Sequence, residues 1–337
     1  MQAGAGLTRT VVAILVLVGA AAPSSAQNLV VRYGQSGSAY KSIYALPVAL
    51  AQREGHFKRE GLELQVVIPV DAGADRMITE LHADAYDLAH VATPFLVRAA
   101  LAGSDAVAIA AEFNDPIYSL VARPEIARVA DLKGKVVGFA DAGGSISYSM
   151  RKLLAKHGLG ERDVQAKTVE GTPSRLSCLR RGECAAVPLG QPQDLLAKSQ
   201  GYRILGTSIE AVPPYLYTVT AVRRSWATAH EDAVVRYVRA LARAFADIRD
   251  PKKKSVVVQT IVELTAVPPA IAEGVLALYA GSGRKVFPER GEIDVQGIAQ
   301  VIAFMEETGQ VKAPRPDPRR FVELKYQRLA GNSGQRP

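Results

Sequence analysis

Segments with a strand pattern alternate with segments with a helix pattern along most of the chain, and this alternation limits the possible folds more than any other feature. Residues 62–68 are typical of a strand, because apolar residues occupy every second position until Pro69 ends the pattern. Residues 45–53 before them place apolar side chains on one helical face, and Gly55 ends that helix. Strands that alternate with helices form parallel sheets covered by helices on both faces. The sequence therefore predicts an α/β fold.

The same patterns continue through two α/β blocks and change to a mainly helical last third. Strands are predicted at residues 29–31, 62–68, 87–91, 107–111, 117–121, 136–139, 164–169, 185–187, 202–205 and 216–222. Helices between them are predicted at residues 45–53, 77–81, 94–101, 148–157 and 193–198, with one more after Thr172 and Pro173. The late helices are predicted at residues 230–249, 256–264, 269–279, 295–307 and 318–329.

Two α/β blocks predict two lobes, which the strand-like segments near 117–122 and 215–222 connect. We expect residues 27–121 and 222–330 to form lobe 1, with the late helices packed on it, and residues 122–221 to form lobe 2. Residues 331–337 contain glycine and polar residues and are expected to be a flexible tail.

The first 26 residues have the composition of a secretory signal peptide. Arg9 precedes an apolar run over residues 11–22, and the small residues Ser24 and Ala26 stand at the −3 and −1 positions of a cleavage site. A membrane anchor, the alternative, needs about 18 consecutive apolar residues. We therefore expect cleavage after Ala26 and secretion of the mature chain into a bacterial periplasm.

Composition indicates a folded chain and excludes several classes of protein. Of the 337 residues, 48% are hydrophobic and 22% are charged, which excludes a disordered or collagen-like chain. The formal net charge of +8 favours an anionic partner weakly, because the basic residues are scattered. The densest basic clusters, residues 223–224 and 252–254, contain no aromatic residues, so we expect no nucleic-acid binding.

Motifs for catalysis, cofactors and metals are not found in the sequence. Gly34 and Gly37 do not make a dinucleotide-binding fingerprint, and Val136 follows Gly134 and Lys135 where a phosphate loop needs Ser or Thr. The five histidines have no metal-ligand spacing, and no Gly-x-Ser-x-Gly elbow occurs. We expect neither enzyme activity nor a cofactor nor a metal site. A nucleophile at a serine of residues 145–147 is the alternative.

Cys178 and Cys184 are the two cysteines of the chain. In an oxidising compartment they are able to form a small-loop disulfide. The alternative is two buried free thiols, one on a helix and one on the following strand. The spacing does not decide between the two, because the distance between the side chains cannot be read from it.

Several loops between a strand and the next helix have the composition of a ligand site. Ligands of parallel α/β sheets bind beyond the carboxyl ends of the strands, where helix N-termini offer free N–H groups and a positive dipole end. Hydroxyl and glycine residues concentrate in these loops, and an amide side chain lies in one of them. The candidates for contacts to an acidic ligand group are Ser36, Ser38, Thr93, Gly144, Ser145, Ser147 and Gln191.

Three tyrosines near these loops, Tyr40, Tyr148 and Tyr215, are candidates for packing against an organic part of a ligand. The alternative for each hydroxyl is a plain helix N-cap, which is favoured at Thr93 and Thr172. Acidic residues also flank the strand ends, so an amine-bearing or zwitterionic ligand stays open. These residues are Glu112, Asp115 and Asp141.

One stretch of the sequence resembles a family hallmark. Residues 46–64 read LPVALAQREGHFKREGLEL, an Ala-containing helix followed by Gly55-x-Phe57 and then by Glu60-Gly61-Leu62 before an alternating strand. This order resembles the periplasmic solute-binding proteins of nitrate, taurine and alkanesulfonate ABC importers, which are kin to the thiamine-pyrimidine synthase-like family. Residues 131–138, DLKGKVVG, look like that family's opening of the second lobe.

Two turns resemble the family with one departure each. Residues 81–87 are similar to its Leu-x-x-Gly-x-x-Asp turn, although Asp84 stands where Gly is usual. Residues 179–185 look like a second such turn, with Gly182 in place but Cys184 where Asp is usual. The resemblance runs from about residue 29 to residue 330 and points to the family without indicating a ligand.

By this resemblance the chain is a type II periplasmic binding protein, with two α/β lobes joined by a two-strand hinge and a ligand in the cleft between them. An ABC permease and ATPase complex is the implied membrane partner, and the implied state is a monomer. Positions that match the family place Asn114 at or near the cleft together with six of the candidates above. The alternatives are a periplasmic sensor without transport and an enzyme of the pyrimidine-synthase-like fold, whose cysteine-rich iron site two cysteines do not supply.

Overall fold

The computed structural model describes residue 1 and residues 28–69, 76–140 and 143–331. The predicted signal peptide with its cleavage site after Ala26, the predicted tail beyond Gly331 and Asp141 lie outside the described residues.

The described residues form two five-stranded sheets. The first has the order β2-β1-β3-β10-β4 and the second the order β7-β6-β8-β5-β9. The strands of the first sheet are β1 (Leu29–Gly34), β2 (Leu62–Val67), β3 (Leu88–Ala92), β4 (Ala106–Phe113) and β10 (Thr218–Arg223). Those of the second are β5 (Ser119–Ala122), β6 (Val136–Phe139), β7 (Gln165–Thr168), β8 (Ala186–Leu189) and β9 (Arg203–Thr207).

Each sheet is parallel apart from one strand. β1 pairs in parallel with β2 and β3, whereas β10 runs antiparallel to β3 and β4. β6 pairs in parallel with β7 and β8, whereas β5 runs antiparallel to β8 and β9. The predicted α/β fold with two blocks is therefore confirmed, and the exceptional strand of each sheet is the one that follows a crossing from the other sheet.

The chain crosses between the sheets at residues 114–118 and 208–217. β5 consequently belongs to the second sheet and β10 to the first. The expected lobe boundaries, after residues 121 and 221, differ from this: they put residues 119–121 with the first block and residues 218–221 with the second. A strand pattern identifies a strand but does not say which sheet it pairs with, because its partners lie far away in the sequence.

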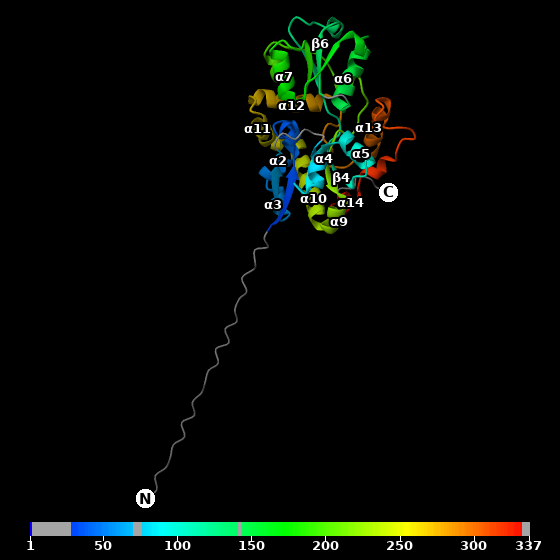
Figure 1. The fold of residues 1–337 in the computed structure, drawn as a ribbon. Coiled ribbons are helices and arrows are strands. Elements are labelled where there is room, and N and C mark those ends of the chain that lie inside the picture. The colour runs from blue at the N-terminus through cyan, green and yellow to red at the C-terminus, as the bar shows by residue number, and fades with distance from the viewer. Residues whose placement is uncertain (2–27, 70–75, 141–142, 332–337) are drawn as a thin grey trace.

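Helices cover both faces of each sheet. Around the first sheet lie η1 (Ile43–Ala45), α1 (Gly37–Tyr40), α2 (Leu46–Arg53), α3 (His56–Arg59), α4 (Met77–His82), α5 (Thr93–Leu101), α9 (Arg224–Ala229), α10 (Glu231–Arg249) and α14 (Lys325–Leu329). Around the second lie η2 (Val129–Leu132), α6 (Ser145–Lys156), η3 (Glu161–Asp163), α7 (Thr172–Arg180), α8 (Gln193–Ser199) and η4 (Ser208–Glu210). Figure 1 shows α6 and α7 beside β6 in one half of the molecule, with α2, α4 and α10 in the other.

Two of the late helices touch both halves. After η5 (Pro251–Lys253) come α11 (Lys254–Thr265), α12 (Pro269–Gly281) and α13 (Val295–Glu307). α12 contacts α8, and α13 contacts both α5 and α6, so these helices lie at the junction of the halves (Figure 1). Among the described residues no single helix is long and apolar enough to cross a membrane; residues 251–265 and 269–281 meet that test only as a pair, bent by 115°.

The predicted helix over residues 318–329 is wrong in its middle. The segment forms η6 (Pro318–Phe321) and α14, which residues 322–324 separate. Val322 pairs with Ala108 of β4, and the Glu323 N–H donates a 2.9 Å hydrogen bond to the Ala108 carbonyl. The segment breaks because its backbone bonds to the edge strand instead of to its own helix.

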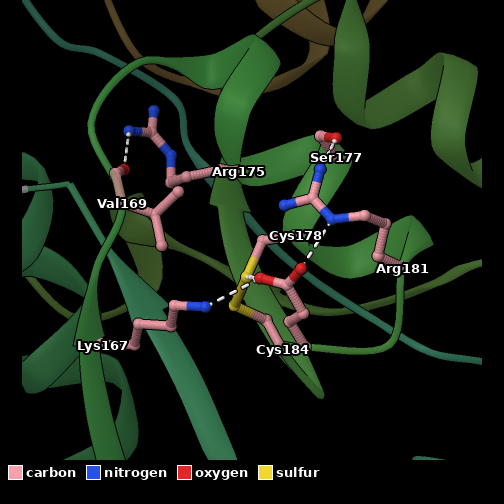
Figure 2. Close-up of a disulfide and its surroundings, with 8 residues drawn as sticks. Lys167, Val169, Arg175, Ser177, Cys178, Arg181 and Cys184 are labelled. Atoms are coloured by element: carbon pink, nitrogen blue, oxygen red, sulfur yellow. Dashed lines mark hydrogen bonds and ion pairs between the residues drawn. A yellow bond between two sulfur atoms is a disulfide. The ribbon is translucent and has the colours of Figure 1, made fainter.

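Cys178 and Cys184 form a disulfide with their Cα atoms 5.4 Å apart. It joins the last turn of α7 to the segment that leads into β8, as Figure 2 shows. Glu183 between them pairs with Lys167 and Arg181, and the hydrogen bonds from these two cations lower the pKa of the Glu183 carboxyl to about 2. Of the two alternatives that the sequence left open, the disulfide is confirmed.

Candidate ligand-binding cleft

A cleft of about 830 Å³ lies between the two sheets. Its walls come from the segments that follow β1, β3, β6, β7 and β8, together with Tyr118 and Tyr217 from the two crossings. Drug-sized ligands occupy pockets of about 300–1,000 Å³, so the cleft has room for a small organic molecule. It lies at the carboxyl ends of parallel strands, where α/β sheets bind ligands.

Five helices begin at this cleft: α1, α5, α6, α7 and α8. All five N-cap residues are described, and none of their side chains accepts a hydrogen bond from the first turn of its helix. The first-turn N–H groups and the positive ends of the helix dipoles are therefore not neutralised by N-cap side chains. Such helix starts favour an anionic group of a ligand.

Five of the predicted site residues line the cleft: Ser36, Ser38, Gly144, Ser145 and Gln191. The two serines of α1 lie close together, with 3.4 Å between their Oγ atoms. Gly144 and Ser145 open α6, the longest of the five helices. The structure thus brings three separate predicted loops together in one place.

Two predicted residues lie behind the cleft wall and hold the backbone. Thr93 is fully buried, and its Oγ1 donates a 3.1 Å hydrogen bond to the Tyr217 carbonyl. Ser147 is also fully buried, and its Oγ accepts a 3.1 Å hydrogen bond from the Ala140 N–H. Each side chain is used inside the protein and does not line the cleft.

The expected N-caps at Thr93 and Thr172 are wrong. Both residues are the first residues of their helices, and the N-cap positions belong to Ala92 and Gly171. The Thr93 hydroxyl bonds to Tyr217, whereas the Thr172 hydroxyl accepts a 3.0 Å hydrogen bond from Arg175. The local sequence pattern predicted that these hydroxyls cap helices, but in the structure they form hydrogen bonds with other groups instead.

The remaining predicted residues lie elsewhere. Tyr40 is exposed on α1, and Asn114 lies in the first crossing, where its N–H donates a 2.8 Å hydrogen bond to the Val286 carbonyl. Tyr148 and Tyr215 line a second cavity of about 380 Å³ beside α13. The Tyr148 hydroxyl donates a 2.8 Å hydrogen bond to Glu307.

Gln191 lines the cleft, but both ends of its amide are bonded within the protein. Its Nε2 donates a 2.7 Å hydrogen bond to Asp194, and its Oε1 accepts a 3.0 Å hydrogen bond from the Tyr279 hydroxyl. Asp194 also accepts a 2.6 Å bond from the Ser119 hydroxyl, and burial raises the pKa of its carboxyl. The amide of Gln191 is therefore held rigidly, and its neighbour Gln193 lines the cleft with an Oε1 that has no hydrogen-bond partner.

Sequence reasoning missed an aromatic group in the cleft. Tyr44, Tyr118 and Tyr217 pack together, with ring centroids 5.4 Å to 6.4 Å apart. The hydroxyls of Tyr118 and Tyr217 are 3.1 Å apart and hydrogen-bonded. Burial raises the pKa of Tyr44 and Tyr217 well above the usual range, so both rings stay neutral. Strand-rich crossings with tyrosine were the only sequence signal for this group.

Sequence reasoning also missed the charged residues of the cleft, which are His90, Arg98, Glu170 and Arg175. Arg175 is buried, and three hydrogen bonds fix its guanidinium: to the carbonyls of Pro188 and Val169 and to Thr172. Figure 2 shows the bond to Val169. Glu170 and Arg98 are exposed at the rim. No periodic pattern marks these residues, because each belongs to a different element.

Two of the three acidic residues for which the sequence allowed an amine-bearing ligand, Glu112 and Asp115, are described, and neither lines the cleft. Glu112 is fully buried beneath His90, which donates or accepts a 2.6 Å hydrogen bond at Nδ1. Asp115 is buried in the first crossing, 3.2 Å from the Arg284 guanidinium. Within the part of the chain that the structure describes, no three His, Cys, Asp or Glu side chains gather as a metal site would require.

The fold is that of the periplasmic binding proteins. The chain belongs to the NMT1/THI5-like family, whose sequence model matches residues 42–254, more than half of the chain. The expected membership in a family of periplasmic binding proteins is thereby confirmed.

Two curated relatives match parts of the chain. A Haemophilus influenzae protein named for thiamine biosynthesis is 27% identical over 124 residues, which cover 36% of this chain and 38% of that protein. The binding protein YtlA of Bacillus subtilis is 26% identical over 209 residues, or 60% of this chain and 62% of that protein. The matched part of the chain thus spans less than two thirds of either relative.

Solved structures share the fold over most of the chain. The alkanesulfonate-binding protein SsuA of Xanthomonas axonopodis pv. citri, bound to MOPS, gives a TM-score of 0.69 at 20% identity and covers 88% of this chain and 98% of its own. The nitrate-binding protein NrtA of Synechocystis PCC 6803 gives a TM-score of 0.74 at 14% identity, and the match covers 91% of this chain and 89% of that protein. The desulfurization enzyme DszB gives a TM-score of 0.65 at 13% identity, and the match covers 91% of this chain and 100% of that protein. The fold therefore occurs in binding proteins and in an enzyme.

Proposed function

We propose that this chain is the ligand-binding component of an ABC importer and that it binds a small anionic organic solute in the cleft between its lobes. The signal peptide is cleaved after Ala26, and the mature chain works as a monomer in the periplasm. The cleft residues Ser36, Ser38, Gly144 and Ser145 contact the ligand. A membrane permease with its ATPase then receives the ligand from the closed form, which ligand binding favours.

The observation that carries this proposal is the convergence of five helix starts on one cleft of about 830 Å³. Helix starts attract anions such as carboxylate, sulfonate or nitrate. The tyrosines of the cleft add an apolar surface for an organic part of the same ligand. Solved structures with this fold include proteins named for alkanesulfonate and nitrate binding, which supports the class of ligand.

A thermal-shift panel on residues 27–337 tests the proposal. The panel contains nitrate, taurine, alkanesulfonates, aromatic carboxylates and, as the uncharged set, aminopyrimidines. A ligand at about 100 times its dissociation constant adds about 2.7 kcal/mol to the free energy of unfolding. For lobes of this size we expect a rise in Tm of roughly 5–10 °C with one anionic compound class.

A pair of variants shows whether the shift comes from the cleft. Ser38→Trp fills the cleft from α1 and should abolish the shift, since Ser38 lines the cleft and is exposed to it. Ser199→Trp places the same side chain at an exposed position at the end of α8 and should leave the shift unchanged. A shift that survives Ser38→Trp, or one found with aminopyrimidines alone, would contradict the proposal.

Once the panel has identified a ligand, an uptake assay distinguishes a transport role from a sensing role. Cells that lack this chain should lose uptake of that ligand at low concentration. Normal uptake by those cells would leave a periplasmic sensor as the function of the same cleft.

An enzyme of the same fold is the second candidate, and the His90–Glu112 pair favours it. A histidine oriented by a carboxylate is a common general base. Mass spectrometry of the ligand after long incubation with the protein decides between the two. We expect the ligand to be recovered unchanged, and a new product that disappears in His90→Gln would establish an enzyme.

A further inference from the structure

His90 and Glu112 form a buried pair beneath the floor of the cleft. His90 lies on β3 and Glu112 on β4, with β10 between them in the sheet. The His90 Nδ1 and the Glu112 Oε2 are 2.6 Å apart. The Glu112 Oε1 accepts a 2.9 Å hydrogen bond from the Tyr33 hydroxyl and a 2.7 Å bond from the Thr220 hydroxyl. The Glu112 side chain is fully buried, so this pair has no bulk water to solvate a charge.

The charge of this pair depends on a single proton. The ion pairs and hydrogen bonds of Glu112 in the described chain come from hydroxyls and His90, and no Lys or Arg is among them. Burial raises the pKa of Tyr33, Tyr44 and Tyr237 around the pair well above the usual range, so these groups are neutral. A buried net charge is costly. The pair is therefore most stable when it holds one proton and has no net charge.

Both neutral arrangements of the pair leave a hydrogen on His90 Nε2. In one, Glu112 is ionised and His90 is an imidazolium, with hydrogens on both ring nitrogens. In the other, Glu112 is protonated and donates to Nδ1, so the neutral ring carries its hydrogen on Nε2. Only the pair that has lost its proton, with a net charge of −1, has a bare Nε2. The identity of the Nε2 group thus reports the proton count of the pair.

Thr218 adds a second hydroxyl group on the same face of the sheet. Thr220 pairs with His90 and Thr218 with Ala92, so the side chains of His90 and Thr218 point to the same side. Both residues line the cleft. Thr218 is only 2% exposed, and its Oγ1 has no hydrogen-bond partner. Such a buried hydroxyl requires a partner that the ligand is able to supply.

The surroundings of these two groups favour an acidic partner. Arg98 and Arg175 line the same cleft, together with the helix starts. Among the described residues Glu170 is the one acidic residue that lines it, and Glu170 is exposed at the end of β7. Acceptors with a negative charge form the stronger hydrogen bonds with N–H and O–H donors.

We propose that His90 and Glu112 share one proton as a neutral pair, and that the His90 Nε2–H and the Thr218 hydroxyl bind the acidic group of the ligand. This inference rests on the proposed function, because it names the residues of that cleft that select the acidic group. Loss of the proton turns Nε2 into an acceptor and leaves a negative charge below the ligand. Anion affinity therefore falls when the pair is deprotonated.

The first experiment tests the pair without any ligand. Nitrogen-15 NMR of the histidine rings is recorded on residues 27–337, and the His90 signals are assigned by their loss in His90→Gln. We expect a proton on Nε2 of His90 in spectra recorded at about pH 6.5. A bare Nε2 with a proton only on Nδ1 at that pH would overturn the proposal, whatever binds in the cleft.

The second experiment measures calorimetric affinity for ethanesulfonate and propanesulfonate, whose sulfonate groups do not titrate near neutral pH. Affinity of the unchanged protein should fall about tenfold or more from about pH 6 to about pH 9, as expected for loss of a charged hydrogen bond. The double variant His90→Gln with Glu112→Gln should make affinity independent of pH, because neither amide titrates. Glu112→Gln should move the fall to lower pH, and Thr218→Val should weaken binding at every pH by about tenfold.

His157→Gln is the matched control, because His157 is an exposed histidine at the end of α6. It should keep the affinity and the pH profile of the unchanged protein. A flat profile in the unchanged protein, or the same fall in the double variant, would overturn the proposal. Failure of every alkanesulfonate to bind at any pH would instead count against the anionic ligand of the proposed function, and the ring-nitrogen spectrum would still decide the state of the pair.

Discussion

Serines two residues apart at the start of α6 have different surroundings, although the sequence treats Ser145 and Ser147 as equivalent. Ser145 lines the cleft, whereas the Ser147 Oγ accepts a hydrogen bond from the buried Ala140 N–H. Neighbours at this spacing on a helix point in different directions, by about 200° of rotation around its axis. One loop therefore supplies both a ligand contact and a contact that holds the loop itself.

Single alanine variants should separate these two tasks. Ser147→Ala leaves the Ala140 N–H without its acceptor and should lower the free energy of unfolding by about 1–3 kcal/mol. Ser145→Ala should lower the free energy of unfolding less than Ser147→Ala does, and it should weaken binding of the ligand found by the thermal-shift panel. Chemical denaturation and calorimetry measure the two effects. The assignment fails if Ser145→Ala keeps full affinity or if Ser147→Ala is as stable as the unchanged protein.

Asp115 in the first crossing should make stability depend on pH. Burial raises the pKa of its carboxyl to about 7, although the nearby Arg284 lowers it. Between its ordinary value of 3.8 and about 7 the folded protein holds a proton that the unfolded chain has released. Stability should consequently fall as pH rises through this window, by up to about 1.4 kcal/mol per pH unit.

Asp115→Asn should remove this part of the slope. Denaturant titrations at about pH 5, 6 and 7 are the measurement, and the curves of variant and unchanged protein should diverge as pH rises toward 7, because the asparagine stays neutral while Asp115 ionises on unfolding. Asp131→Asn is the control, because a hydrogen bond from Arg128 lowers the pKa of Asp131 and its carboxyl stays ionised in this window. Parallel curves for Asp115→Asn would show that Asp115 is already ionised at pH 5.

Two positions where the chain departs from its family pattern show how a turn adapts to its residue. Asp84 stands where glycine is usual and has a φ of 57°, in the left-handed region that favours glycine. Its side chain pairs with Arg223. Cys184 stands where Asp is usual and bonds to Cys178 instead.

At the scale of elements, the disulfide connects the end of α7 with the strand that follows it. α7 begins at the cleft, where Thr172 and Arg175 lie, and has Cys178 in its last turn. The glycine at 138 fits beside this link, because a Cβ there would lie 2.9 Å from Val187 Cγ1 and 3.1 Å from Cys184 Sγ. The helix and the two strands are thus packed closely around the sulfur atoms.

Removing the disulfide should destabilise the second half of the molecule. Cross-linking a loop this short stabilises a protein by about 2 kcal/mol, by restricting the unfolded chain. Cys178→Ala with Cys184→Ala should therefore lower the free energy of unfolding by about that amount in denaturant titrations. The unchanged protein under reducing conditions should match the double variant. An equal stability of reduced and oxidised protein would contradict this expectation, and alkylation of both thiols without reductant would contradict the disulfide itself.

At the scale of the whole molecule, the end of α13 and the residues after it connect the two halves across the cleft. Gln310 donates a 2.8 Å hydrogen bond from Nε2 to the Gly143 carbonyl, and its Oε1 accepts a 2.7 Å bond from Arg98. Glu307 accepts bonds from Tyr148 and Lys152 of α6. A segment from the end of the chain therefore holds both walls of the cleft.

Gln310→Ala should shift the protein toward more open forms. Loss of these hydrogen bonds costs about 1 kcal/mol, which reduces the ratio of closed to open forms about fivefold. Small-angle X-ray scattering without ligand should give a larger radius of gyration. Gln296→Ala, an exposed glutamine of α13, should leave the radius unchanged. Equal scattering from both variants would show that Gln310 does not hold the halves together.

The sequence by itself determined the α/β class, the two blocks, most elements and the loops that form the cleft. These follow from local patterns: the apolar alternation of residues 62–68 needs no distant partner to predict a strand. The helix starts are local too, which is why Ser36 and Ser145 were found. The family resemblance added the order of the lobes.

Only the tertiary structure decided which side chains face the cleft and which sheets β5 and β10 join. His90 forms its hydrogen bond with Glu112, which lies 22 residues away on another strand. The amide of Gln191 forms hydrogen bonds with Asp194 and Tyr279 inside the protein. The sequence predicts that Thr93 caps a helix, but its hydroxyl donates a hydrogen bond to the carbonyl of Tyr217, 124 residues away. The packing of whole helices and strands determines such partners. The free-energy cost of burying a polar group depends on the hydrogen-bond partners that lie near it in the folded structure.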